Sequence, residues 1–254
     1  MIDTHCHLDA TEFDLDRAAV VARSVGVGVT QIVVPAVSVH NFAAVQEMCV
    51  AYPLCLSALG LHPIYAMQHR PEDLAVLRTA VVAARPVAIG EIGLDLFVRG
   101  VDMAQQLYYF TEQLKIAHDM DLPVLLHTRH ANDEIMKQLR RFNIKRGIAH
   151  AFNGSMQQAE VFIKQGFKLG FGGAMTYSRA TNLRRLARDV PLEAIVLETD
   201  APDMSPSWAH GQRNSPEYLA HIAQVLADLR GLPLVTIIQT TTQNAWTVFN
   251  EDAA

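Results

Sequence analysis

The stretch from residue 87 to residue 129 decides the fold expected for this chain. It reads VAIGEIGL at 87–94, MAQQLYYFTEQLKIAHDM at 103–120 and PVLLHTR at 123–129. The outer segments are short apolar runs typical of buried strands, and the middle segment has apolar residues at helical spacing. Asp102 precedes the middle segment, where its side chain can cap a helix. A strand, a helix and a second strand in this order predict a parallel sheet.

The same alternation extends in both directions along the chain. Eight short apolar runs recur, at 2–7, 31–37, 56–62, 87–94, 123–129, 147–152, 167–173 and 195–201. Each interval is long enough for a helix, and further helices are expected at 155–165, after Ser155 as cap, at 216–229 and at 234–249. Eight strand–helix units predict an α/β fold, a closed (β/α)8 TIM barrel with extra C-terminal helices. An open doubly wound sheet is the alternative, but no glycine-rich phosphate loop follows the first run.

Composition limits the classes of function. Half of the residues are hydrophobic, which is enough for one core, and we expect a single domain over residues 1–254. The net charge is −5, so a nucleic-acid substrate would need a local cationic patch.

No run of about eighteen apolar residues occurs, which predicts no membrane span, and the first residues lack the features of a secretory signal. An odd set of cysteines (Cys6, Cys49 and Cys55) without zinc-site spacing fits a reduced, cytoplasmic protein. Nothing points to an obligate protein partner.

Polar side chains gather where the predicted strands end. His5 and His7 alternate along the first run, so they share one face of a strand. That face reaches the carboxyl-terminal rim of the barrel, where barrel enzymes carry their chemistry. Other runs end in His62, Glu91, His127, Arg129, His150 and Asp200. A lone buried histidine is usually a hydrogen-bonded core residue, but five histidines and two carboxylates at one rim favour a functional site.

The chemistry of these groups predicts a metal site. Neutral imidazoles and carboxylates bind divalent ions such as zinc, manganese or magnesium. The candidate ligands are His5, His7, Glu91, His127, His150 and Asp200. Six ligands exceed the three that one catalytic zinc usually takes, so we expect two ions that share a ligand. Glu91 can bridge through its two oxygens, whereas no lysine precedes Lys115 to supply a carboxylated bridge from the first four strands.

Several longer motifs carry a family resemblance. They are DTHCHLD at 3–9, GLHP at 60–63, GEIGLD at 90–95, HTR at 127–129, HAFNG at 150–154, ETDAP at 198–202 and RNSP at 213–216. With these motifs in this order, the chain resembles the TatD family of metal-dependent hydrolases and deoxyribonucleases, within the amidohydrolase-like barrel superfamily. The resemblance implies one metal held by His5, His7, Glu91 and Asp200 and a second held by Glu91, His127 and His150. It also implies hydrolysis of phosphodiester bonds, typically in DNA.

The loop after the last predicted strand departs from the family pattern. Family members commonly carry Arg-Gly-Lys before an Asn-x-Pro motif, but the matching residues here are His210, Gly211 and Gln212. Two cationic groups that could meet phosphates are therefore missing. Arg213 and Asn214 remain and are predicted to contact substrate.

Roles follow for the other rim residues. A metal lowers the pKa of its water toward about 7 in favourable zinc sites, and Asp200 is predicted to accept the proton of that water, with Glu91 also in the catalytic set. His62 is predicted to contact substrate or protonate the leaving group, with a helix-capping or core role as the alternative. Arg129 lies on the face of His127 nearer the mouth and suits a phosphate, with a structural salt bridge as the alternative.

The remaining polar residues are expected to have supporting or surface roles. Glu198 and Asp3 are expected to lie deeper in the barrel, and Asp95 to fix a loop or orient a histidine. Four histidines that lie on presumed helices or loops are expected to be solvated: His40, His69, His118 and His221.

The sequence therefore predicts a divalent-metal-dependent phosphodiesterase that acts on single-stranded DNA ends. Hydrolysis of a small ester, an amide or an aminoacyl-RNA with the same metals is one alternative, and the missing cations favour it. A non-catalytic binding protein is the other, and the complete ligand set argues against it.

Overall fold

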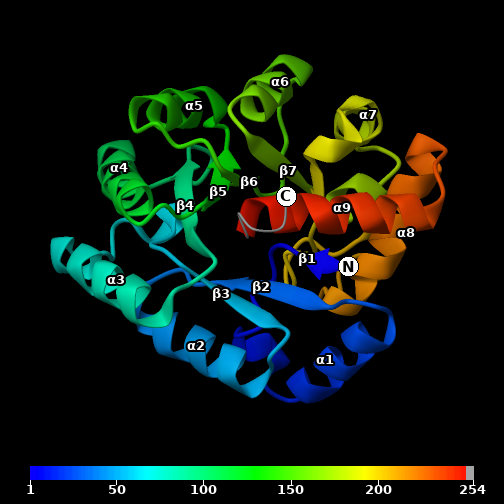
Figure 1. Ribbon diagram of the computed structural model, residues 1–254, viewed down its shortest axis with the longest axis horizontal. Helices are drawn as coiled ribbons and strands as arrows, with labels where there is room; N and C mark the ends of the chain where they lie inside the picture. Colours follow the sequence, from blue (N-terminus) through cyan, green and yellow to red (C-terminus); the bar gives the residue numbers. More distant parts are fainter. Residues whose placement is uncertain (250–254) are drawn as a thin grey trace.

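The computed structural model describes residues 1–249, and its centre is one eight-stranded parallel sheet (Figure 1). The strands are β1 (Ile2–Asp3), β2 (Gln31–Pro35), β3 (Cys55–Leu59), β4 (Ala88–Asp95), β5 (Val124–Arg129), β6 (Gly147–Ala149), β7 (Phe167–Phe171) and β8 (Ile195–Leu197). Each strand pairs in parallel with the next one along the chain. Strand order therefore follows sequence order, as a TIM barrel requires.

Helices separate the strands and surround the sheet (Figure 1). They are α1 (Arg17–Gly26), α2 (Phe42–Ala51), α3 (Pro71–Ala84), α4 (Met103–Asp119), α5 (Asn132–Arg141), α6 (Met156–Lys164), α7 (Thr181–Asp189), α8 (Leu219–Arg230) and α9 (Leu234–Phe249). The (β/α)8 barrel with extra C-terminal helices is thus confirmed. The helix expected at 216–229 begins with a 3-10 turn, η7 (Pro216–Tyr218), before α8.

The sequence signals for two helix starts are also confirmed. The Asp102 carboxylate accepts a hydrogen bond from the backbone N–H of Ala104 at 2.9 Å, and α4 begins at Met103. The Ser155 hydroxyl accepts one from the backbone N–H of Gln158 at 3.1 Å, which starts α6. Each cap satisfies a donor that the first helical turn leaves unpaired.

The first and last strands meet through the backbone that follows them. The N–H of Thr4 donates to the carbonyl of Leu197 at 3.0 Å, and the N–H of Asp200 donates to the carbonyl of His5 at 2.8 Å. The N–H of His7 then donates to the carbonyl of Ala201, also at 2.8 Å. These bonds close the barrel and hold His5 and His7 in extended backbone beyond the short β1.

Helix α9 covers one end of the barrel (Figure 1). Its residues Ala245 and Val248 pack against apolar side chains that seven strands send into the barrel interior. Those side chains are Ile2, Val33, Ala58, Ala88, Leu125, Ile148 and Val196. The Asn244 amide of α9 also donates to the carbonyls of Leu192 and Ile195, just before and at the start of β8, at 2.8 and 2.7 Å. Helix α9 therefore closes the amino-terminal end and leaves the carboxyl-terminal rim for the polar groups.

Among residues 1–249, no single helix is long and apolar enough to cross a membrane, and the bent pair Pro216–Arg230 and Leu234–Phe249 passes that test by length and composition only. The predicted single domain over 1–254 includes residues 250–254, which lie outside the described residues.

Candidate metal centre

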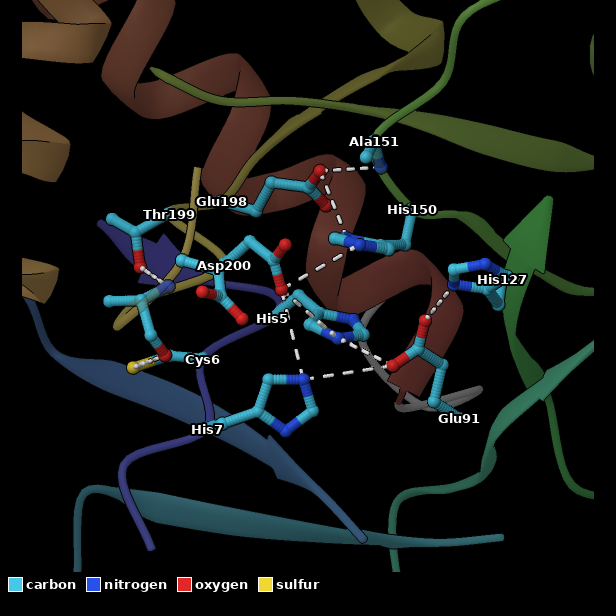
Figure 2. A network of polar contacts seen from close by, with 12 residues as sticks. His5, Cys6, His7, Glu91, His127, His150, Ala151, Glu198, Thr199 and Asp200 are labelled. Atoms are coloured by element: carbon cyan, nitrogen blue, oxygen red, sulfur yellow. Dashed lines mark hydrogen bonds and ion pairs between the residues drawn. The ribbon is translucent and has the colours of Figure 1, made fainter. Parts of the chain in front are cut away.

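The predicted metal ligands meet at the carboxyl-terminal rim of the barrel (Figure 2). His5 and His7 follow β1, Glu91 lies within β4, and His127 lies in β5. The remaining two, His150 and Asp200, follow β6 and β8. Residues from five strands therefore converge although up to 195 positions separate them in the chain.

Glu91 is the centre of the group. Its Oε2 lies 3.1 Å from His5 Nε2 and 3.7 Å from His7 Nε2. Its Oε1 lies 2.8 Å from His127 Nδ1 and 3.3 Å from His62 Nε2. Figure 2 shows the carboxylate between His5 and His127. Each oxygen thus faces a different pair of histidines, which is the arrangement a bridging carboxylate needs.

Asp200 faces the same space from the opposite side. Its Oδ1 lies 3.8 Å from His5 Nε2, 3.7 Å from His7 Nε2 and 3.7 Å from His150 Nε2. Asp200 has a left-handed backbone, with φ of 59°, at the turn that leaves β8. The turn is held at Thr199, whose N–H and hydroxyl donate to the buried Asp3 carboxylate at 2.9 and 2.6 Å. Asp3 therefore supports the site from deeper in the barrel, as expected.

Three groups of side chains are close enough together to hold a metal ion among the described residues. They are His5, His7 and Asp200; His5, Glu91 and His150; and His62, Glu91 and His127. The structure thus brings together all six predicted ligands and adds His62. The exact division of ligands between two ions stays a prediction, because the family resemblance pairs His150, and not His62, with His127.

Two further carboxylates orient the histidines. Asp95 Oδ2 lies 3.0 Å from His127 Nε2, while Asp95 Oδ1 accepts from the backbone N–H groups of Phe97 and Val98, both at 2.9 Å. Asp95 therefore fixes both a loop and a histidine, as predicted. A carboxylate behind a histidine fixes its tautomer and leaves the other ring nitrogen free to bind metal.

Glu198 has the same relation to His150. Its Oε1 lies 3.1 Å from His150 Nδ1 and accepts from the backbone N–H of Ala151 at 2.6 Å. Room for this carboxylate comes from Gly170 in β7, because a Cβ atom there would lie 2.1 Å from Glu198 Oε2. Glu198 thus directs His150 Nε2 toward Asp200.

His62 has a different partner behind its ring. Its Nδ1 accepts a hydrogen bond from the backbone N–H of Ile64 at 3.2 Å, so it caps the short 3-10 helix η3 (Pro63–Tyr65). Burial lowers the pKa of His62, which favours a neutral ring with its proton on Nε2. Nε2–H then points at Glu91 and the cavity as a donor. This tautomer suits a contact to substrate better than a metal ligand, which needs a free lone pair.

Burial lowers the pKa of His5 to about 3, so its ring is neutral, whereas two other histidines favour the charged form. Burial opposes the charged form of His127, but hydrogen bonds to Asp95 and Glu91 outweigh it and raise the pKa to about 9. Burial is likewise outweighed at His150, where the charges of Glu198 and Asp200 raise the pKa to about 10. Divalent ions can replace such protons, because metal binding deprotonates its ligands. The donor set therefore fits divalent metal ions.

Five of the six predicted ligands, all except His5, form the floor of a cavity of about 1130 Å³ at the rim, here called the main cavity. Six carboxylates line it: Asp9, Glu12, Glu91, Glu198, Asp200 and Asp203. Arg129 is the one arginine or lysine among its described lining residues. Its guanidinium lies 3.9 Å from the centre of the Phe97 ring and 4.0 Å from Asp95 Oδ2, and its side chain is 47% exposed. Arg129 thus lies at the mouth, as its predicted contact with phosphate requires. It also lies near Asp95, as the alternative role in a structural salt bridge requires.

The other two predicted substrate contacts do not reach the main cavity. Arg213 makes two bonds with the Asp16 carboxylate, at 2.7 and 2.8 Å, and donates to the carbonyl of Glu12. Asn214 is buried, and its amide donates to the carbonyls of Thr199 and Asp203, both at 2.7 Å. Both residues therefore hold loops near the site, and their predicted contact with substrate has no support from this geometry.

Histidine exposure was predicted correctly except at His69. His40, His118 and His221 are exposed. His69 was expected to be solvated, which is wrong, because it is buried with its Nε2 3.0 Å from the carbonyl of His62. That contact steadies the loop that carries His62, and no periodic pattern marks it in the sequence.

Comparison with known proteins identifies the family. Residues 2–250 match the model of a family described as TatD related DNase. This chain belongs to the TatD family. It is 42% identical over 252 residues to YjjV, a metal-dependent hydrolase of Escherichia coli K12, and the match covers 98% of this chain and 97% of YjjV. It is 33% identical over 240 residues to a 3'-5' ssDNA/RNA exonuclease TatD of Erwinia billingiae, over 91% and 92% of the two chains.

Solved structures agree as well. The crystal structure of Escherichia coli YjjV matches this TatD protein with a TM-score of 0.95 at 42% identity, covering 98% of each chain. A TatD family hydrolase of Entamoeba histolytica has a TM-score of 0.88 at 18% identity, also covering 98% of each chain, which shows the shared fold. The chain is thus a metal-dependent hydrolase of the TatD family.

Proposed function

We propose that this protein is a phosphodiesterase that removes nucleotides from the ends of single-stranded DNA and holds two divalent ions, such as zinc, manganese or magnesium. The observation that carries the proposal is Glu91, whose two oxygens face separate sets of histidines on the floor of a deep cavity. The relative named as a 3'-5' ssDNA/RNA exonuclease supports the substrate class. Free Cys6, Cys49 and Cys55 support a reducing compartment such as the cytoplasm.

The six predicted ligands would hold the divalent ions, which would lower the pKa of a water and place positive charge beside the phosphate. Asp200 accepts the proton of the attacking water, because its carboxylate faces the ligand histidines and burial raises its pKa to about 6. Neutral His62 donates its Nε2–H to the oxygen on which negative charge develops as the bond to phosphorus breaks. Arg129, at the mouth, binds a non-bridging phosphate oxygen.

The shape and charge of the cavity favour a free strand end. The carboxylates of its lining repel a polyanion, and Arg129 alone offers permanent positive charge among the described lining residues. A bond within a duplex cannot easily reach the floor of a pit, whereas the end of a single strand can enter. Binding should therefore be weak and strongly dependent on salt.

Linear and circular single strands of the same sequence test this function. The purified protein is loaded with manganese, magnesium or zinc, and release of nucleotides is followed by gel and by chromatography. We expect stepwise loss from the linear strand and an intact circle. Equal degradation of the circle would contradict the requirement for an end.

The charge of the cavity also favours a second candidate, a metal-dependent hydrolase of a small ester, an amide or an aminoacyl-RNA. Such substrates need less cationic surface than DNA, and this chain has His210 and Gln212 where the resemblance to the TatD family leads us to expect cations. Hydrolysis of a small ester or amide, with both DNA strands left intact, would establish this candidate in place of the nuclease.

A further inference from the structure

A second hollow adjoins the main cavity on the side of β7. It has a volume of about 450 Å³ and lies between residues 174–180 and 204–211; we call it the side pocket. Ala174 and Met204 line both hollows, so they form a shared wall. Arg179 and His210 line the side pocket, and none of its described lining residues carries a carboxylate.

The two loops that form the side pocket are held tightly together. A Cβ atom at Gly173 would lie 2.3 Å from the carbonyl oxygen of Met204, so the backbones are in close contact. The Thr176 hydroxyl accepts from the N–H of Ser207 at 2.8 Å, and the Tyr177 hydroxyl donates to the carbonyl of Ser205 at 3.0 Å. The pocket is therefore built by fixed backbone.

The polar groups of the side pocket are oriented by these contacts. The Tyr177 hydroxyl donates its hydrogen bond to the carbonyl of Ser205. Its oxygen can therefore accept a second hydrogen bond from His210 Nδ1–H, which lies 3.0 Å away. The Arg179 guanidinium lies 5.5 Å from the centre of the Tyr177 ring. Among the described residues no carboxylate lies within ion-pairing distance of Arg179, in contrast to Arg213 with Asp16. Arg179 thus keeps its charge free for an anion.

We propose that the side pocket binds a backbone phosphate of the nucleic-acid strand, one or more nucleotides away from the bond cleaved in the main cavity. The proposal rests on the proposed nuclease function. Arg179 supplies the charge, and because Ala174 and Met204 border both hollows, one strand can lie across the two.

The test compares Arg179→Ala with Arg185→Ala. Arg185 is an exposed arginine of the adjacent α7 that donates to the Asn182 side chain, so its removal deletes the same charge outside the pocket. Binding of a fluorescent phosphorothioate oligothymidylate to the metal-loaded protein is measured by anisotropy at several salt concentrations. We expect Arg179→Ala to weaken binding about two- to fivefold, the range of an exposed ion pair. The slope of log affinity against log salt should fall by about 0.7, the value of one phosphate contact on a single strand.

Hydrolysis of bis(p-nitrophenyl) phosphate, which is too short to reach both hollows, should be equal in wild type and Arg179→Ala. A salt slope equal to that of wild type, or a fall matched by Arg185→Ala, would overturn the proposal. So would an equal loss of activity on the short substrate, because Arg179 would then act on the metal centre.

Failure of the proposed nuclease function would be recognised separately, as absence of oligonucleotide binding by the wild type. Anion binding in the side pocket is then tested by titrating inorganic phosphate into the 15N-labelled protein and following the NMR chemical shifts. Shifts at Tyr177 and His210 that Arg179→Ala abolishes and Arg185→Ala retains would support an anion site. Their absence, or their persistence in Arg179→Ala, would overturn it.

Discussion

The main cavity and the side pocket share a wall at Ala174 and Met204, yet they carry opposite charge. Six carboxylates line the main cavity beside one arginine. The side pocket has Arg179 and His210 and no carboxylate among its described lining residues. The charge of the first hollow favours cations, and that of the second favours anions.

The difference bears on the proposed function, in which an acidic protein acts on a polyanion. Carboxylates that bind metal ions necessarily repel a phosphate chain until the ions neutralise them. A cation close to a carboxylate pairs with it and has less charge to offer the substrate, as the 4.0 Å approach of Arg129 to Asp95 at the mouth illustrates. The side pocket has no carboxylate among its described lining residues, so the proposed phosphate contact of Arg179 lies apart from the predicted metal ligands.

Metal removal should give the largest effect and separate the two hollows. Chelation should reduce hydrolysis to the uncatalysed background, while the part of the salt-dependent binding that depends on Arg179 persists. Elemental analysis after metal loading and dialysis should approach about two ions per chain, the number a bridged site holds. A firm ceiling of one ion in fully active protein would contradict the dinuclear centre.

Asp200→Asn should give the next largest effect, confined to the main cavity. The amide is nearly isosteric, so the fold should remain, but it cannot accept the proton of water. We expect kcat to fall on the order of a hundredfold or more, as for loss of a general base. Asp203→Asn is the matched control, since Asp203 is an exposed residue of the same loop. Near-wild-type turnover of Asp200→Asn with its metals bound would remove Asp200 from the role of base.

The fold and the floor of the main cavity were predictable because both depend on local periodicity. Alternation of His5 and His7 placed both rings on one face, and both rings indeed lie near Glu91. Eight apolar runs gave eight strands, and parallel strands bring their carboxyl ends to one rim. Position along a strand was therefore enough to place most ligands.

Contacts between distant loops left no such pattern. Asp16 pairs with Arg213 across 197 positions, and His210 meets Tyr177 across 33, through turns whose paths depend on tertiary packing. The helix at 234–249 was expected, but its place across the barrel end depends on interior side chains such as Val33. The side pocket could not be predicted from the sequence for the same reason.

Arg129→Ala should have a moderate effect that distinguishes the mouth from the floor. The side chain is half exposed and stacked on Phe97, so its loss should leave the fold and the metal content unchanged. We expect KM for single-stranded DNA to rise about fivefold, near the upper range of an exposed ion pair. Steady-state kinetics with elemental analysis measures both. Lys137→Ala, an exposed cation on α5, is the control. An effect on kcat alone would place Arg129 with the structural salt bridge to Asp95.

Arg213→Ala should give the smallest effect on catalysis. Sequence motifs predicted a substrate contact, but the guanidinium is bound by Asp16 and by the carbonyl of Glu12, and it covers the buried Phe13 ring at 4.6 Å from its centre. Exposed ion pairs contribute little to stability, so the variant should fold, with a slightly lower Tm. We expect KM for single-stranded DNA to change less than about twofold, within the lower range of an exposed pair. Thermal denaturation and steady-state kinetics on the same preparation separate the two effects. A rise in KM as large as that of Arg129→Ala, with Tm unchanged, would mean that Arg213 leaves Asp16 for the substrate, and the sequence-based assignment would then be right.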